Sequence, residues 1–137
     1  MTQSIFVDTD IVLDLLARRE PFYDAAARLF TLAETGTLSL SVSSLSFANL
    51  FYILRKQVSG RHAQEVLRDF KQLVTVLPVD DAVVEQALQS DFTDFEDALQ
   101  YFSALSGGCN ALLTRRSALP HAPISIFTAE TYLRRER

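Results

Sequence analysis

Short β-prone runs alternate along the chain with stretches in which apolar residues recur every three or four positions. Strands that are separated by helices favour a parallel sheet with helices on both faces. We expect the first strand to be central. The predicted strands span 4–7, 38–42, 74–77, 111–114 and 124–127, and the predicted helices span 11–16, 22–35, 44–57, 63–72, 81–88, 94–106 and 129–135.

Length and composition favour a single domain, residues 1–137, in the cytoplasm. The chain is 48% hydrophobic and 22% charged, which is typical of a globular protein. No apolar run approaches the roughly 18 residues that span a bilayer, and the N-terminus has no secretory signal pattern. The single cysteine, Cys109, excludes an internal disulfide, and we expect it at a buried strand position.

Two aspartates, Asp8 and Asp10, lie at the junction between the first strand and the first helix. Asp10 is placed to cap the helix, since it lies beside unpaired N–H groups. Asp8 directly follows an apolar run and falls at the edge of the sheet, beyond the carboxyl end of its strand. Ligands of parallel sheets bind at that edge. Asp8 is therefore the leading candidate for a functional side chain.

A second acidic cluster lies at the start of the sixth predicted helix. Asp94 and Asp97 are about 60° apart around the helix axis, and they lie in or beside its apolar arc, whereas Glu96, Gln100 and Ser103 form the predicted polar face. Capping explains Asp94 but not Asp97. Neighbouring acids repel, and Mg²⁺ or Mn²⁺ would remove that repulsion through oxygen ligands. A solvated acidic face is the alternative.

Three ordered stretches together resemble the PIN domain family over nearly the whole chain. They are FVDTDIVLDLL with REPFY, VSSLSFANLFYILRK, and DFEDALQY with the later LLTR. The resemblance implies a three-layer α/β/α sandwich with a central parallel sheet. It also implies metal-dependent hydrolysis of an RNA substrate with Mg²⁺ or Mn²⁺. Many members are toxins of bacterial toxin–antitoxin pairs, so an antitoxin protein and a homodimer are the implied partners.

The resemblance assigns roles to individual positions. Asp8 and Asp97 are the implied catalytic metal ligands, and Asp94 is an additional acid beside them. Asn49 stands where many relatives have glutamate, and its amide oxygen is able to ligate directly or through water. Thr114 is expected to hydrogen-bond near the metal site.

Arg116 and Leu119 depart from the family pattern, which has polar or acidic residues at those positions. Arg116 would add a cation beside the metal, or take its place by pairing with Asp8 or Asp97. Two hypotheses stay open as a result. One is an active, toxin-like ribonuclease, and the other is a PIN-fold protein with weakened catalysis that acts through protein or RNA binding.

A third class is a phosphatase of the haloacid dehalogenase type. The run Asp8-Thr9-Asp10-Ile11-Val12 has the Asp-x-Asp-x-Val pattern of that class, in which Asp8 would be the nucleophile. The chain is short for such an enzyme, and it has no convincing lysine strand motif. We therefore rank this hypothesis below the two PIN hypotheses.

The net charge of −4 argues against a generally basic nucleic-acid binder, but it allows a local basic rim around an acidic site. An ordinary solvated charge pattern is the alternative to such a rim. Four apolar residues of the third helix are candidates for a dimer interface or for core packing: Phe47, Phe51, Tyr52 and Leu54. The candidate rim residues are Arg18, Arg19, Arg55, Lys56, Arg115, Arg116, Arg134, Arg135 and Arg137.

Overall fold

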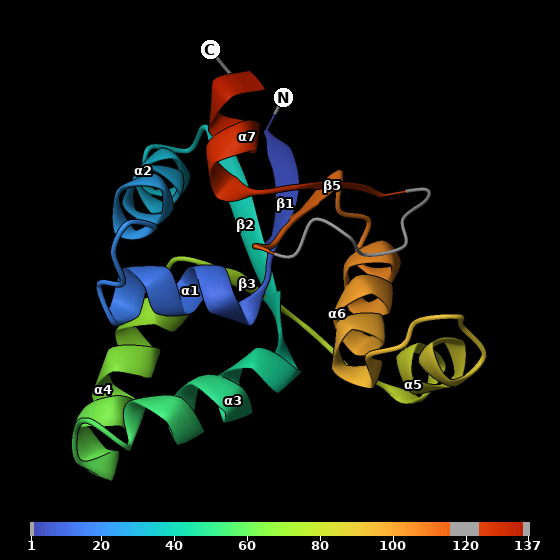
Figure 1. Cartoon of the computed structure of the whole chain (residues 1–137), viewed down its shortest axis with the longest axis horizontal. Coiled ribbons are helices and arrows are strands. Elements are labelled where there is room, and N and C mark those ends of the chain that lie inside the picture. Colours follow the sequence, from blue (N-terminus) through green and yellow to red (C-terminus); the bar gives the residue numbers. More distant parts are fainter. Residues whose placement is uncertain (1, 116–123, 136–137) are drawn as a thin grey trace.

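The computed structural model describes residues 2–115 and 124–135, and the strands of this part form one parallel sheet. The strand order is β3-β2-β1-β4-β5, so β1 is central, as predicted (Figure 1). The order changes direction between β1 and β4, which is where sheets of this kind bind ligands. The strands are β1 (Gln3–Val7), β2 (Leu38–Ser43), β3 (Thr75–Leu77), β4 (Ala111–Leu113) and β5 (Ser125–Phe127).

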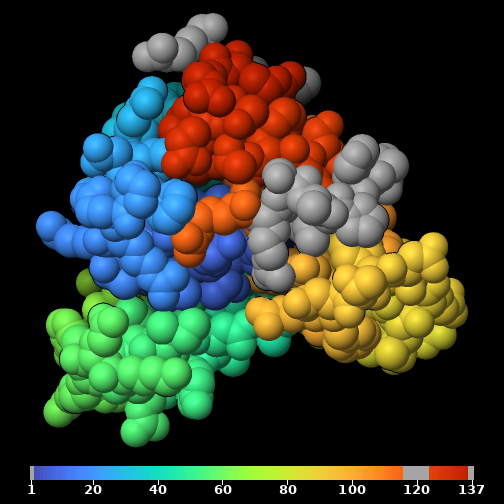
Figure 2. Space-filling model, in the orientation of Figure 1, coloured from blue at the N-terminus to red at the C-terminus, as the bar shows by residue number. Residues whose placement is uncertain are grey.

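Helices cover both faces of the sheet, which confirms the predicted three-layer α/β/α sandwich. In Figure 1, α1, α2 and α7 lie on one side and α6 lies on the other, and Figure 2 shows α5 and α6 as a lobe beside α3. No helix in the described part of the chain is long and apolar enough to cross a membrane. The helices are α1 (Thr9–Leu16), α2 (Tyr23–Glu34), α3 (Ser44–Leu54), α4 (Gly60–Lys71), α5 (Asp81–Leu88), α6 (Phe95–Ser106) and α7 (Ala129–Arg135).

The central strand shows why the sheet needs cover on both sides. Successive side chains of a strand point to opposite faces. Ile5 and Val7 are fully buried in the larger core with α1, α2 and α7, whereas Phe6 is fully buried in the smaller core with α6. The apolar run of β1 is therefore continuous rather than alternating.

Local sequence signals set several helix boundaries as predicted. Ser43 caps α3 by accepting a hydrogen bond from the backbone N–H of Ser46, and Asp80 caps α5 in the same way through Val83. These side chains satisfy N–H groups that have no partner within the helix. Cys109 is buried as expected, but it lies before β4 rather than within it, so its predicted strand position was wrong.

The predicted polar face of α6 was also wrong. Gln100 and Ser103 are only 2% and 1% exposed, whereas the apolar Phe95 is 46% exposed. The helix runs past strand ends that carry polar groups, and these groups need hydrogen-bonding partners. Ser103 donates to the carbonyl oxygen of Pro78 at 3.0 Å, just beyond the end of β3. Polar residues of α6 therefore face inward.

Candidate functional site

The candidate site forms where three strands end at one edge of the sheet. Asp8 follows β1, Ser43 ends β2 and Thr114 follows β4. The sheet hydrogen bonding continues through two of these residues, because the N–H of Asp8 donates to Leu113 O and that of Thr114 donates to Phe127 O, both at 2.9 Å. The backbone positions of Asp8 and Thr114 are therefore fixed by the sheet itself.

Asp8 is 4% exposed, and neutral donors hold its carboxylate. Oδ1 accepts from the backbone N–H of Thr9 at 2.8 Å and from Nε2 of Gln100 at 3.2 Å, and Oδ2 accepts from Oγ1 of Thr114 at 2.9 Å. A carboxylate accepts about four hydrogen bonds, two at each oxygen. The described residues thus fill the acceptor capacity of Oδ1 and half that of Oδ2, so Oδ2 is the atom that can accept a cation.

Asp97 is also buried, at 4% exposed, in the first turn of α6. Asp94 is exposed and caps that helix, since its Oδ1 accepts from the backbone N–H of Asp97 at 3.1 Å. Asn49 lies across from them on α3 and donates from Nδ2 to Oε2 of Glu96 at 2.8 Å. Within residues 2–115 and 124–135, no three acidic, histidine or cysteine side chains are grouped closely enough to hold a metal ion.

Gln100 is the site residue that the sequence analysis missed. It lies one helical turn after Asp97 and contacts Asp8, so it connects the two buried acids that the sequence analysis paired. Its Nε2 is also within 3.2 Å of Thr9 Oγ1 and 3.0 Å of Ser46 Oγ, and its Oε1 accepts from Ser43 Oγ. The sequence did contain one indication of this role, because Gln100 is a polar residue three positions after Asp97 and so lies on the same side of the helix.

A second group of acids lies directly beside Asp8. We call the side chains of Asp10, Asp14, Arg115 and Phe22 the arginine cluster. Arg115 lies 4.0 Å from Asp10 Oδ2 through Nε and 3.4 Å from Asp14 Oδ1 through Nη2, and its guanidinium stacks 4.4 Å from the ring centre of Phe22. The predicted capping role of Asp10 was wrong, because Asp8 occupies the N-cap position of α1.

The carboxylates of the arginine cluster are poorly satisfied. Asp14 is 2% exposed, and one buried oxygen of each aspartate accepts no hydrogen bond from the described residues. Burial, together with the negative charge of Asp8, raises the pKa of Asp10 to about 6, although Arg115 opposes the change. Burial also raises the pKa of Asp14. Arg115 is thus a counter-ion to the buried Asp14 and the half-buried Asp10 rather than a free member of a basic rim.

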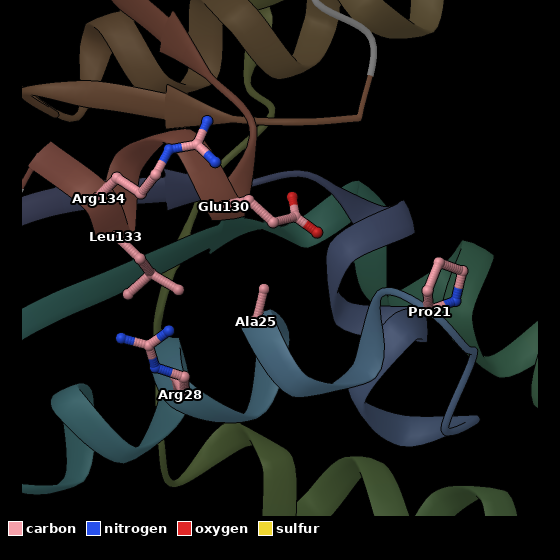
Figure 3. Close-up of a pocket in the computed structure, with 6 residues that line it drawn as sticks. All are labelled: Pro21, Ala25, Arg28, Glu130, Leu133 and Arg134. Carbon is pink, nitrogen blue, oxygen red and sulfur yellow. The ribbon is translucent and has the colours of Figure 1, made fainter.

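A cavity of about 290 Å³ lies between α2 and α7, apart from the predicted ligands. Figure 3 shows Leu133 of α7 pointing toward Ala25 and Arg28 of α2, with Glu130 and Arg134 on the same helix. The cavity combines one acid with two arginines on a mainly apolar floor. None of its lining residues is a candidate metal ligand, so we do not include it in the site.

The comparison with known families decides the classification. A sequence model described as the PIN domain matches residues 4–117, which is most of the chain. The chain belongs to the PIN domain family. The match includes Asp8, Asn49, Asp94, Asp97 and Thr114, so all the predicted site residues lie within the PIN domain.

Three known proteins resemble this chain over most of its length. Ribonuclease VapC1 of Aquifex aeolicus is 23% identical, and the alignment covers 98% of this chain and 96% of that protein. A toxin–antitoxin complex from Klebsiella pneumoniae contains a chain with a TM-score of 0.69 and 16% identity, covering 91% of this chain and 97% of that one. VapC20 of Mycobacterium tuberculosis, a toxin that cleaves the sarcin–ricin loop, has a TM-score of 0.61 and 20% identity, covering 79% and 86%.

The two departures from the family pattern, Arg116 and Leu119, lie outside the described residues. Their predicted effects on the site therefore stay predictions. The described part of the site consists of Asp8 with its three donors, Asp97 one turn from Gln100, and Asn49 with Glu96 on the adjoining helices.

Proposed function

We propose that this protein is a metal-dependent endoribonuclease of the PIN family and the toxin of a toxin–antitoxin pair that acts in the cytoplasm. The observation that carries the proposal is the burial and hydrogen bonding of the Asp8 carboxylate. It is a buried carboxylate at the end of the central strand, held by three neutral donors, with acceptor capacity left at Oδ2. The PIN family match and the likeness to VapC1 support hydrolysis of RNA as the reaction.

The donor set fits a hard divalent cation by its chemistry. Mg²⁺ prefers oxygen ligands, and it is usually bound through one or two carboxylates together with water and substrate phosphates. Asp8 and Asp97 supply two buried carboxylates, and a cation offsets the cost of burying them. We propose these two as the principal ligands for Mg²⁺ or Mn²⁺, with Asp94 as an additional acid and Asn49 as a neutral oxygen ligand.

When bound, the ion would supply Lewis-acid activation of a phosphodiester and of the attacking water. The chain itself does the positioning. Thr114 and the backbone N–H of Thr9 hold the carboxylate of Asp8 in one orientation, and the cap formed by Asp94 fixes the first turn of α6, which carries Asp97. No histidine is needed, because these acids orient and neutralise rather than transfer protons.

A second candidate function is binding without cleavage. It is favoured by Arg116 and Leu119 at positions where the family has polar or acidic residues, and by the lack of a three-acid group among the described residues. In that case the same PIN fold would bind RNA or protein with little turnover. The two functions differ in one measurable respect, which is cleavage of RNA in the presence of metal.

The proposed protein partner is an antitoxin, because structures similar to this chain come from toxin–antitoxin complexes. The structure leaves fewer apolar residues of α3 for a homodimer interface than the sequence suggested. Leu54 is buried, and Phe47 and Phe51 are partly buried against the core, so Tyr52, at 67% exposed, is the most exposed of the four. A homodimer stays a prediction.

The test is cleavage of a structured RNA with EDTA, Mg²⁺ or Mn²⁺. We expect metal-dependent cleavage by the wild type and loss of it in Asp8→Asn and Asp97→Asn. Asp69→Asn is the matched control, since it makes the same chemical change at an exposed position on α4. Cleavage in EDTA, or equal cleavage by all variants, would contradict the mechanism. RNA binding without cleavage by any variant would support the second candidate.

A further inference from the structure

Gln100 is the most fully bonded polar side chain that the proposed mechanism has not used. It is 2% exposed, and its amide contacts four residues from two separate segments of the chain, Asp8 with Thr9 and Ser43 with Ser46. A buried amide that loses its partners costs more free energy than the net value of its hydrogen bonds. Such a residue fixes the relative position of every segment that it bonds.

The orientation of the amide follows from its neighbours. Oδ1 of Asp8 only accepts hydrogen bonds while the carboxylate is ionised, so the atom of Gln100 that faces it must be the donor, Nε2. The opposite atom, Oε1, accepts from the hydroxyl of Ser43. Ser43 in turn accepts from the backbone N–H of Ser46 at 3.4 Å, which leaves its proton free to serve Gln100. The two ends of the amide are therefore not interchangeable.

This orientation decides which oxygen of Asp8 is available. Gln100 and the N–H of Thr9 together use both acceptor positions of Oδ1, whereas Thr114 uses one position of Oδ2. Without the Gln100 amide, each oxygen of Asp8 would accept one hydrogen bond, and the two oxygens would be equivalent as metal ligands. The hydrogen bond from Gln100 to Oδ1 makes them different, so that only Oδ2 keeps an open acceptor position.

Gln100 also sets the spacing between the two buried acids. It is three residues after Asp97 on α6, about 60° away around the helix. Its bonds to Asp8 and Ser46 tie this turn of α6 to the end of β1 and to the start of α3. We infer that Gln100 is a positioning residue that holds Asp8 so that Oδ2 is the metal ligand, at a fixed distance from Asp97.

The inference rests on the proposed metal-dependent function, and it is tested by the affinity for Mn²⁺ alone, measured by electron paramagnetic resonance without RNA. Gln100→Met keeps the length of the side chain but removes both ends of the amide. Loss of an outer partner of a metal ligand costs about 10–100-fold in metal affinity. We expect the dissociation constant of Mn²⁺ to rise within that range in Gln100→Met.

Ser103→Ala is the matched control, because Ser103 is equally buried on the same helix and bonds Pro78 rather than Asp8. We expect Ser103→Ala to lose stability in urea unfolding but to bind Mn²⁺ like the wild type. Equal Mn²⁺ affinities in the wild type and Gln100→Met would overturn the inference. An equal loss of Mn²⁺ affinity in Ser103→Ala and Gln100→Met would also overturn it, because the affinity for Mn²⁺ would then depend only on the stability of the fold.

Ser43→Ala serves if Gln100→Met does not fold. It removes the hydroxyl that orients the amide and leaves Gln100 in place. A rise in the Mn²⁺ dissociation constant of Ser43→Ala supports the inference, and an unchanged constant contradicts it. A wild type that binds no Mn²⁺ would remove the proposed function and the inference together, whereas wild-type binding that survives Gln100→Met would remove the inference alone.

Discussion

The fold stabilises Asp8 and the two neighbouring acids of the arginine cluster, Asp10 and Asp14, in opposite ways. Asp8 receives three hydrogen bonds from neutral donors. Asp10 and Asp14 instead share one cation, Arg115, at 4.0 and 3.4 Å, and each keeps a buried oxygen without a hydrogen bond from the described residues. Neutral donors leave a carboxylate its full negative charge, whereas a cation cancels it. This difference supports the proposal that Asp8, rather than Asp10 or Asp14, is the metal ligand.

The largest expected effect comes from removing the cation of the arginine cluster. Arg115→Met removes the ion-pair partner of the buried Asp14, and breaking a buried pair in this way typically costs several kcal/mol. We expect a loss of about 3 kcal/mol in the free energy of unfolding. Urea denaturation measures it, with Arg115→Lys as the control that keeps the charge. A double variant that adds Asp14→Asn should recover much of the loss, and a lack of recovery would show that Arg115 acts through Phe22 instead.

A smaller effect should follow from pH in the metal-free protein. The pKa of Asp10 is raised from 3.8 to about 6, so the native state binds its proton more tightly than the unfolded state does. The contribution of Asp10 to stability is therefore complete below pH 3.8, and it is lost as the pH rises through about 6.

Asp10→Asn imitates the protonated side chain. In EDTA at pH 7.5 we expect this variant to be about 2 kcal/mol more stable than the wild type, with the difference vanishing near pH 4. Thermal unfolding across this pH range measures the difference. A variant that is less stable than the wild type at pH 7.5 would mean that attraction to Arg115 outweighs the cost of burial.

The smallest effect on stability is expected from removing one of the hydrogen-bond donors to Asp8. Thr114→Val removes one hydrogen bond to Oδ2 and keeps the shape of the side chain, so we expect a loss of about 1 kcal/mol. Thr114→Ser, which keeps the hydroxyl, is the control for the lost bond. Because the lost hydrogen bond orients Asp8, a proposed metal ligand, RNA cleavage should fall by about 10-fold or more in Thr114→Val. Full activity in that variant would show that Thr114 does not orient Asp8.

The sequence predicted the sheet and the position of Asp8 because both depend on local patterns. Apolar runs at strand length alternate with helical spacing, and an acid directly after the central strand must lie at the sheet edge. The predicted strands and helices agree with the structure to within a few residues at their ends. The capping interpretation of Asp94 was equally local, and the structure shows this cap.

Long-range contacts account for what the sequence analysis missed. Helical periodicity placed Gln100 on a polar face, but it is buried because the ends of β1 and β2 supply polar partners 92 and 57 residues earlier in the chain. Asp10 was predicted to be a cap from its place beside the start of the helix. Its ion-pair partner, Arg115, comes only after β4, so the local sequence did not indicate the pair. Neither partner is visible in the neighbouring sequence.

The proposed role of Asp8 as a metal ligand is tested most directly by a calorimetric titration of Mn²⁺ into the wild type, Asp8→Asn and Asp14→Asn. Both variants make the same change at a buried aspartate of the same region, at 4% and 2% exposure. We expect Asp8→Asn to lose more than about 100-fold in affinity, beyond the usual cost of an outer partner, and Asp14→Asn to bind Mn²⁺ like the wild type. Unchanged binding in Asp8→Asn, or an equal loss in both variants, would contradict the proposed role.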